Sequence, residues 1–456
     1  MTKFLFLDYR EIETISGFAR KLEQPVKHEG NPLFIADQPW ENGNMQLYGS
    51  VLKAEGRPFQ MWYTVIHRPW TMYLCYAESD DGIQWRKPLF DIFEHEGQQT
   101  NIVFAEDPHG TAVIYDEAEP REDRRYKLVS GTAPSGCISA HYSPDGIHWS
   151  PVRQKGHPVI TTNPDSPMAF LRQPTGRYAV HHRLHGHGRR VFRSESWDFR
   201  FFSGEPRMIV EPDAGDPPQI QFYGMGAAPY GSYEIGTLWI FSTDPDEMGF
   251  GKSRGYQEAE LTYARHGHAW HRAAQGTPFI PHGGADSWER GNLQCASQPV
   301  FLDDEIRYYY MGTTMTHQRH WELEPQTAGV GMASMQPDRF VALCAGGEPA
   351  ELLTVSFRLP STELLINAAT ESNGWVRVEV LDAEGAPVKG LGRTDCVPVK
   401  GDSTSHQPRW SREQLNHLVG KSIRLRLRAR NARLYSIYAT EPDEEAVYHR
   451  FTAPRP

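Results

Sequence analysis

Cysteine is scarce in this sequence, and its spacing excludes the usual metal sites. The thiols stand far apart, and no two form the C-x-x-C pair of structural zinc and redox sites. The five cysteines are Cys75, Cys137, Cys295, Cys344 and Cys396. Most are predicted to be small buried side chains on strands, and neither a metal nor a cofactor is expected.

Long hydrophobic runs and an excess of positive charge are also missing. No apolar run approaches the roughly 18 residues that span a bilayer, so no membrane partner is expected. Across 456 residues, 57 Asp and Glu stand against 47 Lys and Arg, a formal net charge of −10. A nucleic-acid surface would usually be basic, so nucleic acid is not expected as a partner either. The oligomeric state stays open.

The N-terminus makes a poor signal peptide. Its apolar run is short and is broken by Asp8. We therefore expect a cytoplasmic protein, or a secreted or periplasmic one if a leader has been removed.

Helical tracts and the motifs of several enzyme classes are absent as well. There is no G-x-x-x-x-G-K-[ST] or G-x-G-x-x-G loop before a helix and no G-x-S-x-G elbow, which excludes kinases, dehydrogenases and α/β-hydrolases. Aromatic and turn residues are abundant instead, with 12 Trp, 20 Tyr, 21 Phe, 40 Gly and 34 Pro. This combination favours an all-β protein of many short strands.

A strand that ends in a polar turn before an aromatic residue recurs along the first three-quarters of the chain. The copies span 72–85, 137–149, 190–199, 260–270 and 329–340. Two further strand-like runs precede each copy, such as 45–52 and 59–66 before the first. Repeated units of four antiparallel strands predict a five-bladed β-propeller, with a row of independent sandwiches as the alternative.

The strand pattern changes near Gly346, after which long alternating runs follow. In the run 422–430, Ile423, Leu425 and Leu427 fall on one face and arginines on the other, which predicts a strand with one wet side. We predict a β-sandwich over 346–456, a propeller catalytic domain over 31–345, and an N-terminal segment at the domain junction over 1–30.

Two of the repeated turns are similar to the Asp-box of sialidases, S-x-D-x-G-x-x-W. They span 79–85 and 143–149, each one residue shorter than that motif. Because Asp-boxes are structural in sialidases, Asp81, Trp85, Asp145 and Trp149 are predicted to stabilise the sheets.

The first predicted blade opens with Trp40-Glu41-Asn42-Gly43-Asn44, where invertase-type enzymes carry a W-M-N-D-P-N-G-like segment. A five-bladed propeller followed by a β-sandwich resembles the invertase/levanase-type glycosidases, and the propeller alone resembles the arabinanase/xylosidase group. The chain is identified as a divergent, glycosyl hydrolase family 32-like member of this superfamily. The resemblance implies a glycosidase that removes a terminal sugar from an oligosaccharide or glycan.

Carboxylates precede the first strand of every predicted blade, where the funnel of a propeller opens. Glycoside hydrolysis needs one carboxylic acid and a second carboxylate that attacks or activates water. We expect Glu41 or Asp37 as nucleophile or base, Asp165 as orienting carboxylate or acid, and Asp216 or Glu289 as the remaining partner. A turn cap is the alternative for each. Asp116 follows its strand and is predicted to be a structural ion-pair partner.

Aromatic and basic residues near these carboxylates are candidates for substrate binding. Trp40 and Trp288 are placed to stack on a sugar ring, or to pack in the core, and Tyr223 belongs to the first strand of the fourth blade. Arginines of the His- and Arg-rich run 181–190 could bind a uronate or sulfate group. The candidates for substrate binding are Trp40, His109, Arg183, Tyr223, Trp288 and Arg290. His317 and His320 are candidates for the rim.

Two other functions fit the same sequence. A propeller without catalysis would bind glycans only. A phosphorylase or transglycosidase would replace water with phosphate or another sugar, and Arg183, Arg190 and Arg290 are candidates for binding phosphate.

Overall fold

The chain is almost entirely β-structure and divides into two compact units. The computed structural model describes residues 2–41, 45–67, 71–106, 108–132, 136–154, 157–244, 254–265, 267–317, 328–411 and 414–439. Among the described residues, the larger unit comprises 25–302 and 306–334, and the smaller one combines 2–24 with 303–305 and 335–439. The all-β prediction is confirmed. Within the described residues, no helix has the length and apolar character needed to cross a membrane.

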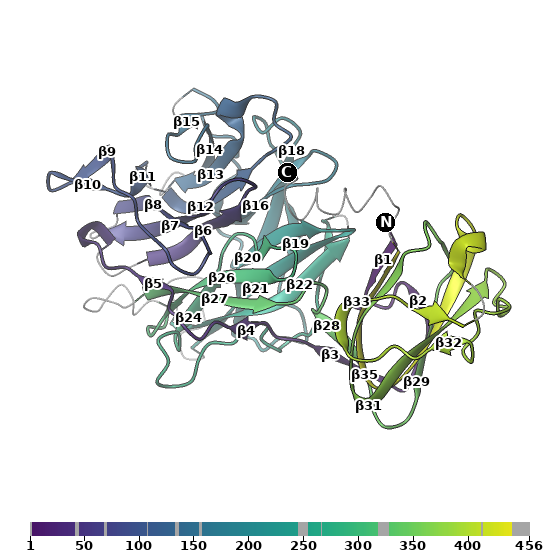
Figure 1. Cartoon of the computed structure of the whole chain (residues 1–456). Coiled ribbons are helices and arrows are strands. Elements are labelled where there is room, and N and C mark those ends of the chain that lie inside the picture. The colour runs from purple at the N-terminus through teal and green to yellow at the C-terminus, as the bar shows by residue number, and fades with distance from the viewer. Residues whose placement is uncertain are drawn as a thin grey trace. The chain divides into compact units, whose positions relative to one another are not determined.

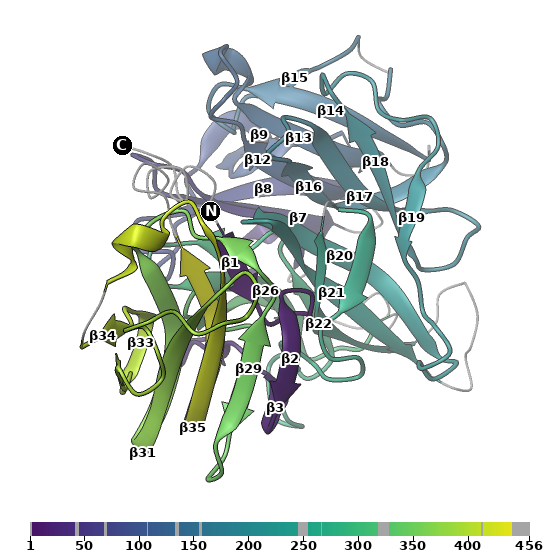
Figure 2. The same ribbon diagram turned by 90° about the vertical axis from the view of Figure 1, so that its right-hand side faces the viewer.

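The larger unit contains three separate four-stranded antiparallel sheets, each built from one continuous stretch of the chain (Figures 1 and 2). The first contains β6 (Met45–Lys53), β7 (Phe59–His67), β8 (Thr71–Ser79) and β11 (Ile102–Phe104). The second contains β12 (Pro108–Tyr115), β13 (Tyr126–Thr132), β14 (Cys137–Ser143) and β15 (Ser150–Pro151). The third contains β16 (Pro164–Arg172), β17 (Tyr178–Leu184), β18 (Val191–Ser196) and β19 (Arg207–Val210).

A ten-stranded sheet follows, built from two arrays. Its first array is β20 (Ile220–Tyr230), β21 (Tyr233–Thr243), β22 (Gly255–Arg265) and β23 (Ala269–Arg272). Its second is β24 (Asn292–Cys295), β25 (Val300–Phe301), β26 (Ile306–Thr313) and β27 (Ala328–Met335), completed by β4 (Val26–Lys27) and β5 (Phe34–Ile35). A parallel bridge between Gln257 and Asn292 joins the arrays. Residues from near the N-terminus thus supply the outer strands of the last array.

The first strands of successive sheets lie side by side. β12 packs between β6 and β16, and β16 packs against β20. Ser297, just after β24, donates its N–H to the Gly49 carbonyl on β6 and accepts a hydrogen bond from the Ala227 N–H on β20. Residues near the beginnings of these strands are therefore brought toward one another.

Polar turns at the outer hairpins are held by short side chains. Asp145 Oδ1 accepts hydrogen bonds from the backbone N–H groups of Ile147 and His148, and from Ser143 Oγ. Asp81 makes the same set of bonds in the first sheet. These carboxylates serve the turns, as the Asp-box similarity predicts.

The shorter elements connect or extend the sheets of the larger unit. A hairpin of β9 (Phe90–His95) and β10 (Gln98–Thr100) separates β8 from β11 (Figure 1). The elements η1 (Pro39–Glu41) and η2 (Glu122–Arg124) are short 3-10 helices.

The smaller unit is a nine-stranded sheet with a separate two-stranded one. The large sheet contains β1 (Thr2–Leu5), β2 (Ile12–Ser16), β3 (Phe18–Leu22), β28 (Val341–Ala345), β29 (Ala350–Thr354), β30 (Phe357–Arg358), β31 (Leu364–Asp382), β33 (Asp402–His406) and β35 (Ser422–Ala439). The small one pairs β32 (Cys396–Val397) with β34 (Arg409–Trp410), and η5 (Leu415–Leu418) precedes β35.

Strand pairing sets where the smaller unit begins and ends. Residues 2–22 and 341–345 belong to it because β1 pairs with β35, and β28 pairs with both β3 and β35. The predicted boundaries at residues 30 and 346 differ from the observed ones, which follow residues 24 and 334. The observed boundaries depend on pairing between strands that are far apart in sequence. Along β35, Ile423, Leu425 and Leu427 are buried, as the alternation predicts.

Candidate functional site

Four of the predicted site residues come together near the beginnings of the first strands. His109 lies on β12, Asp165 on β16, Arg183 on β17 and Tyr223 on β20. Arg183 reaches the beginning of β16 from the end of β17 because the two strands are antiparallel, with Pro164 opposite Leu184. We call these four residues and the groups that contact them the Asp165 cluster.

Both oxygens of the Asp165 carboxylate are bound by neighbouring side chains. Oδ1 lies 3.1 Å from His109 Nδ1 and accepts a hydrogen bond from Ser166 Oγ at 3.3 Å. Oδ2 accepts hydrogen bonds from Arg183 Nε at 2.9 Å and Nη2 at 2.7 Å. Burial would raise the pKa of Asp165, but Arg183 and His109 hold it well below the usual range of a carboxyl group. Asp165 is therefore a fixed carboxylate.

Aromatic side chains surround the buried Arg183 guanidinium. Arg183 Nη1 donates to the Tyr223 carbonyl at 2.7 Å, and the guanidinium lies 4.6 Å from the centroid of the Tyr223 ring. Tyr48, buried on β6, stacks on Trp239 with 5.6 Å between ring centroids. Burial and the neighbouring Tyr223 raise the pKa of Tyr48, so its phenol stays protonated.

Two further cationic or titratable groups border Tyr223. The Arg189 guanidinium lies 5.2 Å from the centroid of the Tyr223 ring and donates to Gln221 Oε1 at 2.6 Å. His317 Nε2 lies 3.1 Å from the Tyr223 hydroxyl. His317 thus borders the cluster, whereas the other candidate for the rim, His320, lies outside the described residues.

Sequence reasoning missed Tyr48, Ser166 and Arg189. Tyr48 lies near the beginning of the first strand of its sheet, and Ser166 follows Asp165. The basic run 181–190 supplies both Arg183 and Arg189, whose guanidinium groups lie against the Tyr223 ring. Arg190, however, pairs with Glu211 at 3.0 Å and is 41% exposed, and it is the preceding Arg189 that borders Tyr223.

The carboxylate of Glu41 lies apart from the Asp165 cluster, and both of its oxygens accept hydrogen bonds from neighbouring residues. Its Oε1 accepts a hydrogen bond from the Tyr63 hydroxyl at 2.5 Å, and its Oε2 accepts from Lys87 Nζ at 2.8 Å and from the Gln38 N–H at 2.9 Å. The side chain is fully buried. Trp40 is buried beside it and donates its indole N–H to Asn101.

Asp37 joins this network at the surface. It pairs with Lys87 at 2.8 Å and is 56% exposed. Burial opposes the effect, but the Lys87 ammonium lowers the pKa of Asp37. Neither Asp37 nor Glu41 contacts the Asp165 cluster among the described contacts.

The remaining predicted carboxylates also have local partners. Asp216 pairs with Arg272 of β23 at 2.5 Å, and Arg272 also binds Glu260. Glu289 is buried and pairs with Lys27 of β4 through Oε1, while its Oε2 has no hydrogen-bond partner in the described structure.

The two predicted binding residues beside Glu289 are also apart from Asp165. The Trp288 ring stacks on Tyr310 with 6.1 Å between centroids, which is packing within the last array. Arg290 is exposed and donates to the Ala285 carbonyl.

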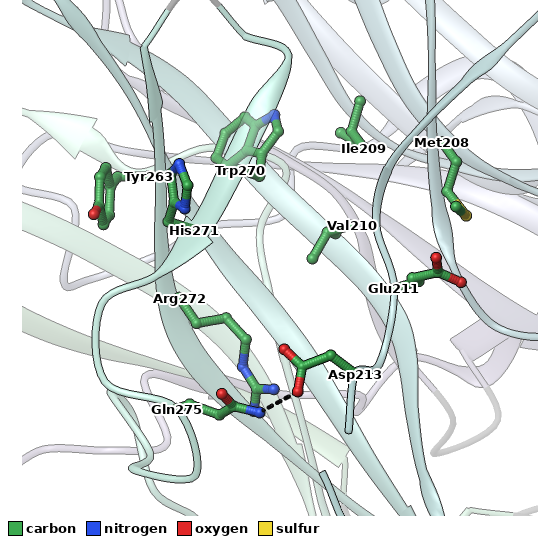
Figure 3. Close-up of a pocket in the computed structure, with 10 residues that line it drawn as sticks. All are labelled: Met208, Ile209, Val210, Glu211, Asp213, Tyr263, Trp270, His271, Arg272 and Gln275. Carbon is green, nitrogen blue, oxygen red and sulfur yellow. Dashed lines mark hydrogen bonds between the residues drawn. The ribbon is translucent and has the colours of Figure 1, made fainter. Parts of the chain in front are cut away.

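A cavity of about 510 Å³ lies between β19 and β23, the outer strands of the third sheet and the next array. Figure 3 shows the rings of Trp270, Tyr263 and His271, with Arg272 and Gln275 next to Asp213. The Arg272 guanidinium forms ion pairs with Asp216 and Glu260. None of the residues that line the cavity belongs to the Asp165 cluster.

Asp116 lies outside the Asp165 cluster and is buried among cations. It pairs with Lys127 at 3.2 Å and Arg172 at 2.9 Å and accepts a hydrogen bond from the Tyr178 hydroxyl. This agrees with its predicted structural role. In the part of the chain that the structure describes, no group of three or more His, Cys, Asp or Glu side chains is arranged to hold a metal ion.

Comparison with known proteins finds similarity only at the level of structure. No protein-family model matches the sequence, and no curated protein matches it. Among solved structures, the chain is similar to a glycosyl hydrolase from Bacteroides ovatus, with 13% identity over 70% of this chain and 95% of that one, and a TM-score of 0.49.

Two further similar structures are those of mannoside-active proteins. One is described as showing that the GH130 family of mannoside phosphorylases contains glycoside hydrolases that target β-1,2 mannosidic linkages in Candida mannan. It has 15% identity over 71% of this chain and 95% of that one, with a TM-score of 0.47. The other is a β-1,2-mannobiose phosphorylase from Listeria innocua, with 12% identity over 68% and 97%, and a TM-score of 0.45.

Proposed function

We propose that the chain cleaves a glycosidic bond at the end of an oligosaccharide or glycan, and that the terminal sugar binds at the Asp165 cluster. The observation that carries the proposal is the convergence of Asp165, His109, Arg183 and Tyr223 from three neighbouring arrays. Fixed hydrogen-bonding groups beside an aromatic ring suit a ligand rich in hydroxyl groups.

The proposal includes the architecture that places this cluster. We propose that the five arrays beginning with β6, β12, β16, β20 and β24 are the blades of a five-bladed propeller. The packing of neighbouring first strands and the Ser297 bonds to β6 and β20 support it. We further propose that the smaller unit is a β-sandwich and that the propeller is of the invertase/levanase or arabinanase/xylosidase type.

Asp165 fits the role of orienting carboxylate. Its depressed pKa keeps it ionised at all physiological pH values, so it can stabilise the positive charge that develops on the sugar in the transition state. The same ionisation prevents it from donating a proton. Glu41, Asp37, Asp216 and Glu289 remain proposed partners, and each would have to leave the ion pair described above to reach the substrate.

Phosphorolysis is a second candidate, favoured by the charges at this site. Arg183, Arg189, His109 and His317 lie around one carboxylate, and a phosphate ion binds to such groups. In that case phosphate would replace water as the attacking group.

A glycoside panel assayed with and without inorganic phosphate tests the proposal. We expect wild type to release a monosaccharide, or a sugar phosphate if the second candidate holds. Asp165→Asn, which keeps the side-chain shape, should lower kcat/KM by about 10²-fold or more. The matched control is Asp145→Asn, which should leave kcat/KM unchanged because the Asp145 carboxylate serves an outer turn. Binding without turnover by wild type would overturn the proposal and leave a glycan-binding propeller.

A further inference from the structure

The His109 imidazole is more exposed than the two charged groups beside it. Its side chain is 32% exposed, against 16% for Asp165 and 6% for Arg183. A substrate that enters the Asp165 cluster would therefore meet the imidazole more readily than the carboxylate or the guanidinium.

Asp165 has little capacity left for covalent or proton-transfer chemistry. One of its oxygens is engaged by two nitrogens of Arg183, and the other by His109 and Ser166. A carboxylate held by a guanidinium stays ionised and cannot act as a proton donor. The leaving group in glycosidic cleavage nevertheless requires a proton.

The two nitrogens of His109 have different surroundings. Nδ1 lies 3.1 Å from Asp165 Oδ1 and 3.2 Å from Ser166 Oγ. Nε2 makes no hydrogen bond to any residue that the structure describes. A carboxylate on Nδ1 fixes the tautomer and orientation of the ring and stabilises the imidazolium, which leaves Nε2 to exchange a proton with a ligand.

Three other groups at the cluster are poorer proton donors, namely Arg183, Tyr48 and Tyr223. Arginine does not lose its proton in proteins, which excludes Arg183. Burial raises the pKa of Tyr48. The Tyr223 hydroxyl is engaged with His317. The charged group that faces His109 from a neighbouring strand is Asp165 on β16, which is itself paired with Arg183 on β17.

We infer that His109 is the catalytic residue that transfers the proton at this site, oriented by Asp165, so that a histidine takes the place of one carboxylate of the usual pair. This inference rests on the proposed function. The Nε2 proton passes to the glycosidic oxygen as its bond to the anomeric carbon breaks and the alcohol leaves. A water oxygen bonds to that carbon, and the proton that the water loses returns to Nε2 through solvent.

The test compares two leaving groups over a range of pH. Wild-type activity should decline at high pH, because a general acid must carry its proton. His109→Gln and His109→Asn should lower kcat/KM by about 10²- to 10⁴-fold on a natural glycan and abolish that high-pH decline. The leaving group of the 2,4-dinitrophenyl glycoside of the same sugar needs no proton. On that substrate the two His109 variants should lower kcat/KM by less than about tenfold. Asparagine can still hydrogen-bond to Asp165, so it controls for loss of folding.

His148→Gln is the matched control, because His148 also pairs with an aspartate, Asp145 at 2.8 Å, but in an outer turn. His148→Gln should leave kcat/KM unchanged on both the natural glycan and the 2,4-dinitrophenyl glycoside. Equal losses on both substrates, or a high-pH decline that persists in the His109 variants, would overturn the inference while the proposed function stands. Wild type inactive on every glycoside would overturn both.

A second measurement does not depend on turnover. Histidine ¹⁵N NMR should show neutral His109 protonated at Nδ1 and should show this preference lost in Asp165→Asn. A neutral form protonated at Nε2 in the wild type would contradict the inference.

Discussion

Arg183 is the residue on which the geometry of the cluster depends most. Its guanidinium binds Asp165 through two nitrogens and the Tyr223 carbonyl through the third, and it is almost fully buried. Arg183→Ala would leave the Asp165 carboxylate partly buried without its main counter-charge. We expect it to lower the free energy of unfolding by about 3–5 kcal/mol, measured by urea denaturation.

Arg183→Lys should cost less stability, because it keeps the charge but loses the planar fork. Arg190→Ala is the control, since Arg190 is half-exposed and forms a surface pair with Glu211, and it should change stability by less than about 1 kcal/mol. Similar losses for Arg183→Ala and Arg190→Ala would contradict the importance given to the buried pair.

For individual residues, the sequence predicted which side chains gather at the cluster better than it predicted their pairing partners. Asp165, His109 and Tyr223 could be expected to lie near one another because each is close to the beginning of a first strand, whereas Arg183 was a candidate from its His- and Arg-rich run. The partners of Glu41 and Asp216 are Lys87 and Arg272, which lie dozens of residues away in sequence, so their pairing could not be predicted.

The hairpin turn is the element in which local sequence determines structure most directly. Asp145 accepts two backbone hydrogen bonds and one from Ser143 inside a single turn. Asp145→Ala should lower the free energy of unfolding by about 1–3 kcal/mol and leave kcat/KM unchanged. Chemical denaturation and the glycoside assay check this, and a loss of activity without a loss of stability would show that the turn serves the site.

Strands β14 and β17 carry buried histidines that make stability depend on pH. Burial lowers the pKa of His141 and of His182 to about 4. Between about pH 6.5 and 4 the unfolded chain binds protons that the native chain does not, so the free energy of unfolding should fall as the pH falls. In this range each of the two histidines lowers the free energy of unfolding by about 1.4 kcal/mol for every pH unit of acidification.

Denaturation at pH 7.5, 6 and 5 measures this slope. His141→Gln should make it shallower by about the contribution of one histidine. A slope that His141→Gln leaves unchanged would show that His141 is protonated in the native state.

For the whole molecule, the informative feature is how the larger unit is completed. Asn31, between β4 and β5, donates to the Tyr310 hydroxyl and the Met332 carbonyl and accepts from the Met332 N–H. Asn31→Ala should therefore lower the free energy of unfolding of the larger unit by about 1–3 kcal/mol. Asn373→Ala, at an exposed pair in the smaller unit, is the control and should have no measurable effect.

The all-β class was predictable because strand periodicity and turn chemistry are local. The positions of β6 and β7 follow the predicted runs 45–52 and 59–66 to within a residue. The use of residues 2–35 was not predictable, because β1, β3 and β4 pair with strands hundreds of residues away in sequence. Such pairings depend on tertiary contacts that one sequence does not reveal.

The central claim is that a terminal sugar binds at the Asp165 cluster. A crystal structure of the Asp165→Asn protein soaked with an oligosaccharide that wild type cleaves tests it most directly. The account predicts the terminal sugar within hydrogen-bonding distance of His109 Nε2 and in contact with the Tyr223 ring. A sugar bound only in the cavity beside Trp270, with the Asp165 cluster empty, would contradict it.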